Sequence, residues 1–117
     1  MKLEVYGLKN CDTCRKARRW LDEMGMAATF HDLRETPPDA QQLDAWAQAA
    51  GGWEKLVNKS STTWRALDAS LKQPDSAEAW LALVQANPTL IKRPLLQTDK
   101  VVVQGFSAEK WKSLLSD

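Results

Sequence analysis

The pattern of apolar and polar residues predicts a strand, a helix and a second strand over the first third of the chain. Residues 3–6 have the character of a short strand, and residues 7–10 read as a turn. From residue 14 to residue 24, apolar side chains recur at helical spacing between charged ones, and Gly25 suits the end of this helix. Residues 27–33 return to a strand pattern. A second strand reached through a crossover helix pairs in parallel with the first, so we predict a βαβ unit.

The middle of the chain has helical patterns only. Asp39 is suited to cap a helix that runs to about Ala50. Further helical segments are predicted over residues 53–57, 62–71 and 76–86. Because no strand pattern occurs between residues 39 and 87, we interpret this stretch as a helical insertion packed beside a small sheet. Its tryptophans are expected to anchor that packing: Trp46, Trp53, Trp64 and Trp80.

The last part of the chain returns to strands and ends in a helix. Residues 90–96 and 101–103 read as two short strands joined by a turn, which makes a hairpin. Ser107 then caps a helix that runs to Leu115. The order is β-α-β, helical insertion over about 39–87, β-β-α, which is the thioredoxin order with an insertion between its halves. We predict one α/β domain over residues 1–117.

Composition narrows the function classes. A chain of 117 residues with six tryptophans can bury one core, and its net charge of +1 provides no global field for nucleic acid or an anionic membrane. No apolar run approaches the roughly 18 residues of a membrane span, and the amino terminus is too short and charged for a signal peptide. We therefore expect a cytoplasmic protein that acts without a membrane and without direct contact to nucleic acid.

Candidate chemistry is concentrated in Cys11 and Cys14, the two cysteines of the chain. A cysteine at the first turn of a helix meets unpaired N–H groups and the positive end of the helix dipole, which favour the nucleophilic thiolate. Cys14, one turn further on, is near enough to attack a sulfur bound to Cys11. A C-x-x-C motif in a βαβ unit of a cytosolic protein is typical of a redox site.

Two other interpretations of the cysteine pair are open to the sequence. Both thiols could be buried and inert, since free cysteine is among the most buried residue types. A closed zinc site needs four ligands, and beyond the cysteines the chain offers only His31 as a nitrogen ligand, so we predict no metal site. His31 itself is expected to be structural or exposed to solvent.

Five further segments of the sequence form a recognisable set: residues 6–13, 16–21, 62–65, 91–96 and 105–107. This set is similar to the ArsC/Spx family, and above all to its YffB-type members, over nearly the whole chain. The resemblance implies a thioredoxin-like fold with a helical insertion. In the arsenate reductases of that family a cysteine after the first strand reacts, with glutathione and glutaredoxin as the electron source. Cys11 occupies that position.

The resemblance also assigns binding residues. Arg93 matches an arginine that precedes a proline and surrounds the oxyanion, and Arg65 matches a second; a guanidinium binds such anions bidentately. Pro94 corresponds to the cis-proline that faces the active cysteine. Lys9 and Asn10, directly before Cys11, complete the predicted substrate-binding set. The third arginine of arsenate reductases is absent, because residues 105–107 are Gly-Phe-Ser, so arsenate is not the expected substrate.

Two functions follow from the resemblance. The first is a thiol–disulfide reductase without a bound cofactor, coupled to glutathione or glutaredoxin, that acts on a small-molecule or thiol substrate. The second is a redox-sensing regulator of the Spx type, which binds RNA polymerase and uses Cys11 and Cys14 as a switch. Spx-type regulators extend past the final helix with a basic tail, and this sequence ends at Asp117, so we favour the reductase.

Overall fold

The computed structural model describes residues 2–116 and consists of two compact units. Residues 2–32 and 93–116 form the sheet unit, and Leu33–Lys92 form the helical unit. The chain leaves the sheet unit after Asp32 and returns to it at Arg93. The predicted fold class, a thioredoxin-like α/β core with a helical insertion between its halves, is confirmed by this arrangement and by the structural comparisons below.

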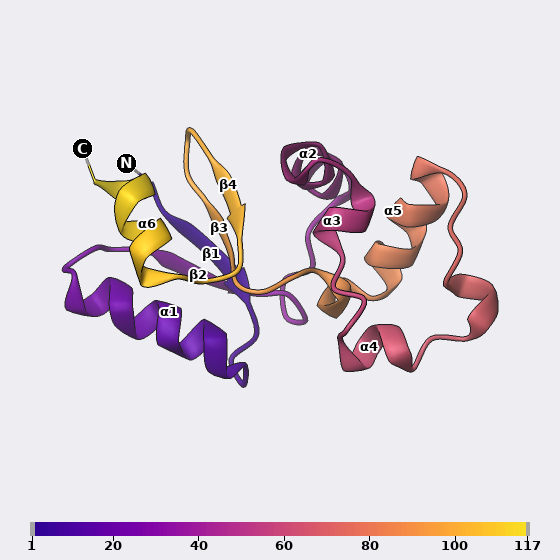
Figure 1. The fold of residues 1–117 in the computed structure, drawn as a ribbon, viewed down its shortest axis with the longest axis horizontal. Helices are drawn as coiled ribbons and strands as arrows, with labels where there is room; N and C mark the ends of the chain where they lie inside the picture. The colour runs from indigo at the N-terminus through magenta and orange to yellow at the C-terminus, as the bar shows by residue number, and fades with distance from the viewer. Residues whose placement is uncertain (1, 117) are drawn as a thin grey trace. The chain divides into compact units, whose positions relative to one another are not determined.

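The sheet unit contains four strands in the order β2-β1-β3-β4 (Figure 1). β1 (Glu4–Gly7) pairs in parallel with β2 (Thr29–Asp32) across the crossover helix α1 (Asp12–Glu23). On its other side β1 pairs antiparallel with β3 (Leu95–Gln97), which forms a hairpin with β4 (Val102–Gln104). The βαβ unit and the hairpin are therefore as predicted.

The register of the sheet decides which side chains reach the core. Val5 lies opposite Phe30 on one neighbouring strand and Leu96 on the other, so these three side chains form one row on one face. Helix α1 and the final helix α6 (Ala108–Leu115) pack against that row in the sheet unit (Figure 1). The cluster that they bury comprises Leu3, Val5, Ala17, Leu21, Leu96, Trp111 and Leu115.

Helix α1 forms where the predicted periodicity places it. Its buried residues Cys14, Ala17 and Leu21 repeat at intervals of three and four, which sets them on one face toward the sheet. The helix ends at Glu23 with Met24 as its C-cap, and Gly25 follows with φ of 70°, a conformation that glycine adopts at little cost. Because Cys14 is the first of these buried residues, the first turn of α1 also packs against the sheet.

The helical unit is built from short helices. Its elements are α2 (Ala40–Ala50), α3 (Trp53–Leu56), α4 (Thr62–Arg65), η1 (Ala69–Leu71), α5 (Ala77–Ala86) and η2 (Pro88–Leu90). Of these, α2, α4, η1 and α5 each begin with a side-chain cap. The caps of the longer helices are Asp39, whose side chain accepts the Gln42 N–H, and Ser76, which accepts the Ala79 N–H. Over residues 2–116, no helix has the length and apolar character that crossing a bilayer requires.

Three of the four tryptophans of the helical unit are buried within that unit; their expected role in packing against the sheet stays a prediction. Trp46 is fully buried in α2, and Trp64 stacks on Trp80 with ring centroids 6.2 Å apart. The Lys59 ammonium lies 5.5 Å from the Trp64 ring centroid and caps this stack. Trp53 is only partly buried.

Three local predictions are wrong. Residues 62–71 are not one helix, because the Asp68 side chain accepts the Ser70 N–H and starts a new 3₁₀ turn after α4 has ended. The strand predicted to begin at residue 90 begins only at Leu95; Pro88, which favours the first turn of a helix, starts η2 instead. Gly7, assigned to a turn, is the last residue of β1.

Trp111→Phe should destabilise the sheet unit. Trp111 is fully buried, its Nε1–H donates to the Gly105 carbonyl at 3.0 Å, and its ring packs edge-on against Phe106. Losing volume and one hydrogen bond should lower the free energy of unfolding by about 2 kcal/mol. Urea denaturation followed by circular dichroism measures this. Trp53→Phe, at a partly exposed site, should cost less; an equal loss in both variants would contradict the assigned packing.

Candidate active site

The candidate site lies in the segment between the end of β1 and the start of α1. Cys11 is the N-cap residue of α1, with extended backbone angles, and it is partly exposed. The loop before it is held from both sides. The Lys9 N–H donates to an Asp32 carboxylate oxygen at 3.2 Å, and the Arg15 Nε–H donates to the Lys9 carbonyl at 3.3 Å. Cys11 therefore has a fixed position at the carboxyl end of β1.

The surroundings of Cys11 favour its thiolate. Partial burial raises its pKa, but the N–H group and thiol of Cys14, the Arg93 guanidinium and the Thr13 N–H together bring the pKa below its ordinary value. The Cys11 side chain makes no cap hydrogen bond, and the N–H groups of Thr13 and Cys14 in the first turn lower its pKa. The lowered pKa of Cys11 agrees in direction with its place at the helix start, and its role as the nucleophile stays a prediction.

Cys14 has the opposite environment. Its side chain is completely buried, and burial together with the neighbouring Cys11 raises its pKa to about 12, although the Leu8 N–H and Arg93 oppose this shift. At neutral pH it is a protonated thiol that donates a hydrogen bond to Cys11. Both cysteines are free in this structure. The pair thus consists of one partly exposed thiol with a lowered pKa and one buried, protonated thiol.

Pairing between strands brings Arg93 to the thiols. Tyr6, near the end of β1, lies opposite Leu95, the first residue of antiparallel β3. The residues just before β3 therefore run beside the residues just after β1. Arg93 is partly buried there and acts electrostatically on both cysteines. The Arg93–Pro94 peptide bond is cis, as the resemblance implied, and the buried Pro94 accepts the Gly105 N–H at 2.8 Å.

The other predicted binding residues are exposed. Lys9 and Asn10 lie in the loop before Cys11, within the sheet unit. Arg65 belongs to the helical unit, where it is the last residue of α4 and its guanidinium donates to the Ser60 carbonyl at 2.8 Å. The roles of these three residues in binding stay predictions.

Sequence reasoning missed Gly7 and Asp32. Asp32 pairs with Gly7 across the parallel strands and anchors the loop before Cys11, which only the register reveals. Gly7 lies against the Cys14 sulfur. The one available signal was its place, a glycine four residues before the first cysteine. His31, expected to be structural, bonds Glu4 through Nε2 at 2.6 Å and stacks on Tyr6.

The segment after β4 offers no cation to the site. Phe106 packs against Trp20 and Trp111 at the edge of the hydrophobic core. Its ring is part of the fold, so this position contributes no guanidinium to an oxyanion. In the segment where the resemblance implies a third arginine, this chain has Phe106, which packs in the core.

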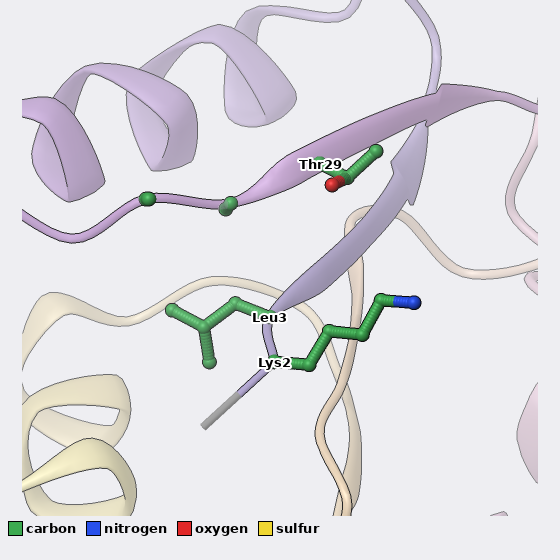
Figure 2. Close-up of a pocket in the computed structure, with 5 residues that line it drawn as sticks. Lys2, Leu3 and Thr29 are labelled. Atoms are coloured by element: carbon green, nitrogen blue, oxygen red, sulfur yellow. The ribbon is translucent and has the colours of Figure 1, made fainter.

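Two hollows lie away from the thiols. One, of about 450 Å³, is lined by Lys2, Leu3, Ala27, Ala28 and Thr29, and Figure 2 shows it at the amino ends of β1 and β2. Cys11 follows the carboxyl end of β1, so this hollow is separate from the candidate site. The other, of about 390 Å³, lies in the helical unit between the 3₁₀ segment and α5. Within the described residues, no group of three or more His, Cys, Asp or Glu side chains could hold a metal ion.

The fold and the two thiols define a thioredoxin-like protein with a C-x-x-C motif at the start of its first helix. The family model for the ArsC family matches residues 6–114, and the chain belongs to this family. An uncharacterised protein of Haemophilus influenzae is 40% identical, over 95% of this chain and 96% of its own. The global transcriptional regulator Spx of Enterococcus faecalis is 28% identical, over 97% of this chain and 86% of its own.

Solved structures agree with this assignment. A protein named YFFB is 35% identical and superposes with a TM-score of 0.90, over 98% of this chain and all of that one. An arsenate reductase from Vibrio cholerae shares the fold with a TM-score of 0.84, covering 98% of each chain, at 22% identity. At that identity the likeness concerns the fold alone. The proteins similar in sequence to this chain thus include one named as a regulator, and the proteins that share its fold include one named as an arsenate reductase.

Removing the charge of Arg93 should make Cys11 harder to ionise. A cation stabilises the neighbouring thiolate, so Arg93→Gln should raise the Cys11 pKa, whereas Arg93→Lys should leave it nearly unchanged. The measurement is the rate of iodoacetamide labelling of Cys11 between pH 4 and pH 10, which should rise with pH and level off at a higher pH in Arg93→Gln.

Two controls accompany this titration. Arg19→Gln removes an exposed charge from α1, the helix that Cys11 caps, and should not shift the pH profile of Cys11 labelling. Cys14, with its pKa of about 12, should remain unlabelled throughout the range. Equal labelling of both cysteines at neutral pH, or an identical profile for Arg93→Gln and the unmodified protein, would contradict the assigned site.

Proposed function

We propose that the protein is a thiol–disulfide reductase in which Cys11 is the nucleophile, Cys14 is the resolving thiol and Arg93 holds an anionic part of the substrate. The observation that supports this most directly is the contrast between the two sulfurs one helical turn apart. Cys11 has a lowered pKa and partial exposure, whereas Cys14 is buried with a pKa of about 12. An inert structural pair would not need one thiol poised to ionise.

The first step uses the Cys11 thiolate. It attacks one sulfur of a disulfide substrate, forms a mixed disulfide with that sulfur and releases the other sulfur as a thiolate. Arg93 acts electrostatically on both reacting cysteines, and we propose that its guanidinium binds a carboxylate or oxyanion of the substrate near the reacting bond. The substrate class that suits this site is a disulfide or other oxidised thiol that carries negative charge.

The second step activates Cys14. While Cys11 is a thiolate, its charge and its hydrogen bond raise the Cys14 pKa, after the larger effect of burial. Once Cys11 is part of a mixed disulfide, that charge is gone and the proton of Cys14 is held less tightly. Cys14 loses this proton to solvent, attacks the Cys11 sulfur and releases the bound thiol as a thiolate. The product is a Cys11–Cys14 disulfide.

We propose glutathione, directly or through glutaredoxin, as the reductant. It is a co-substrate, and the proposal includes no bound cofactor. A guanidinium binds a carboxylate bidentately, so the two carboxylates of glutathione suit Arg93, with Lys9, Asn10 and Pro94 as the further binding residues of the sheet unit. Arg65, in the helical unit, is a separate proposed anion-binding residue. Glutathione can also resolve the mixed disulfide itself, which would bypass Cys14.

A second candidate is a redox-sensing regulator that binds RNA polymerase. It is favoured by the relatives named as Spx regulators, one of which is 28% identical over 97% of this chain. Purified RNA polymerase distinguishes the two functions. A regulator should bind the polymerase with an affinity that changes on oxidation of the thiol pair. A reductase should instead turn over a small disulfide many times with glutathione present.

Oxidised glutathione should modify Cys11 and not Cys14. The unmodified protein should form a mixed disulfide on Cys11 that proceeds to a Cys11–Cys14 disulfide with release of the second glutathione. Cys14→Ser should stop at the mixed disulfide because it lacks the resolving sulfur. Cys11→Ser should remain unmodified because Cys14 is buried and protonated. Peptide mapping by mass spectrometry measures each product, and glutathionylation of Cys14 in Cys11→Ser would overturn the assignment.

Arsenate should be a poor substrate. Relative to the three arginines that the resemblance assigns to arsenate reductases, one charge-assisted contact is missing, which costs roughly 1.5 to 3 kcal/mol, or about one to two powers of ten in affinity. With glutathione and glutaredoxin supplied, arsenate reduction should be slow or undetectable in a preparation that forms the Cys11 glutathione adduct readily. Efficient reduction at micromolar arsenate would show that the segment 105–107 is not a functional departure.

A further inference from the structure

Gly7 is the last residue of β1, and the Cys14 sulfur occupies the space where a side chain at this position would lie. A Cβ atom added to Gly7 would lie 2.5 Å from the Cys14 Sγ, closer than non-bonded atoms approach. Its next neighbours would be the Cys14 Cβ at 3.4 Å and the Phe30 Cε1 at 3.5 Å, both ordinary van der Waals distances. The Cys14 sulfur is therefore the one described atom that a side chain at position 7 would displace.

The backbone conformation does not explain this glycine. Gly7 is a strand residue and has no positive φ, whereas the other glycines, Gly25, Gly51, Gly52 and Gly105, all do. An alanine could adopt the same angles in a β-strand. The space taken by the Cys14 thiol is thus the reason that the structure gives for glycine at this position.

We propose that Gly7 is a positioning residue for the thiol pair. Because Gly7 has no side chain, the Cys14 Sγ fits against the end of β1. There the Cys14 thiol donates a hydrogen bond to Cys11 and can form a disulfide with the Cys11 sulfur. The adjoining Leu8 N–H also contacts the Cys14 sulfur, so residues 7 and 8 form a backbone cradle for one atom. The cradle fixes the sulfur that Cys11 needs, first as a hydrogen-bond donor and then as a nucleophile.

The disulfide part of this inference rests on the proposed function, and the hydrogen-bond part does not. In the disulfide reaction Cys11 and Cys14 together lose two electrons and two protons, and one oxidised glutathione is reduced to two glutathione molecules. In the hydrogen bond, the Cys14 thiol donates to the Cys11 thiolate whether or not any substrate is present. The two parts can therefore be measured independently.

Gly7→Ala should act through the sulfur alone. The new methyl group forces the Cys14 Sγ out of the cradle and breaks its hydrogen bond to Cys11. The lost hydrogen bond should make Cys11 labelling about two- to fivefold slower below its pKa, since fewer molecules carry the thiolate while each thiolate is somewhat more nucleophilic. Disulfide closure with oxidised glutathione should slow as well, and the mixed disulfide on Cys11 should accumulate.

A double-mutant cycle with Cys14→Ala tests this mechanism. Cys14→Ala removes the sulfur, so the methyl group of Gly7→Ala then meets only atoms at ordinary distances. We expect Gly7→Ala, Cys14→Ala and the double variant to share one pH profile of Cys11 labelling, shifted to higher pH than that of the unmodified protein. Thermal melting should show that Gly7→Ala destabilises the protein in the parent and has little effect in the Cys14→Ala background.

The outcomes separate cleanly. If Gly7→Ala shifts the profile and lowers the melting temperature equally in both backgrounds, the residue is a general packing position and the inference fails. The inference also fails if Gly7→Ala leaves both the pH profile of Cys11 labelling and the disulfide yield of the parent protein unchanged. The proposed function fails separately, when the unmodified protein forms no adduct with oxidised glutathione; the labelling cycle still decides the role of Gly7. Should Gly7→Ala not fold, folding of the double variant supports the inference and its failure to fold overturns it.

Discussion

The close contact between the end of β1 and the first turn of α1 is the constraint on which the site depends. Cys14 is completely buried at this junction, and a row of core residues on α1 continues from it along the same helix face. Because the first turn is fixed through Cys14, the N–H groups of that turn stay directed toward the preceding residue, Cys11. The hydrophobic core thus supports the ionisation of an exposed sulfur through one buried neighbour.

The sheet supplies the second part of the site. β3 runs antiparallel to β1, so the residues that enter β3 meet the residues that leave β1. Arg93 reaches both cysteines for this reason, although 79 residues separate it from Cys14 in the sequence (93 minus 14). A helical unit of about half the chain lies between β2 and β3 in the sequence, and β1 and β3 nonetheless pair. The geometry of the thiols is therefore set within the sheet unit.

Local patterns predicted what local interactions determine. Helical spacing and capping residues gave α1, α2, α5 and α6, and β-hairpin signals gave β3 and β4. The break after α4 was missed because the Asp68 side chain competes with the helix for a backbone N–H, which no periodicity reveals. Cys11 and Cys14 could be proposed from spacing and helix position. The contact of Gly7 with sulfur and that of Asp32 with the loop depend on strand register, which is a tertiary property.

The reduced state of the thiol pair also bears on whether the family member acts as an enzyme or as a switch. The contacts of Cys11 with the Cys14 thiol and with Arg93 favour a thiolate, and a thiolate exists only when the pair is reduced. Stabilising the reduced form makes the disulfide easier to reduce. A switch that stores an oxidised state benefits from a disulfide that resists the glutathione pool, whereas a catalyst needs one that is reduced again after each turnover. The contacts of Cys11 thus ease reduction of the disulfide, which is the property that the proposed reductase needs after each turnover.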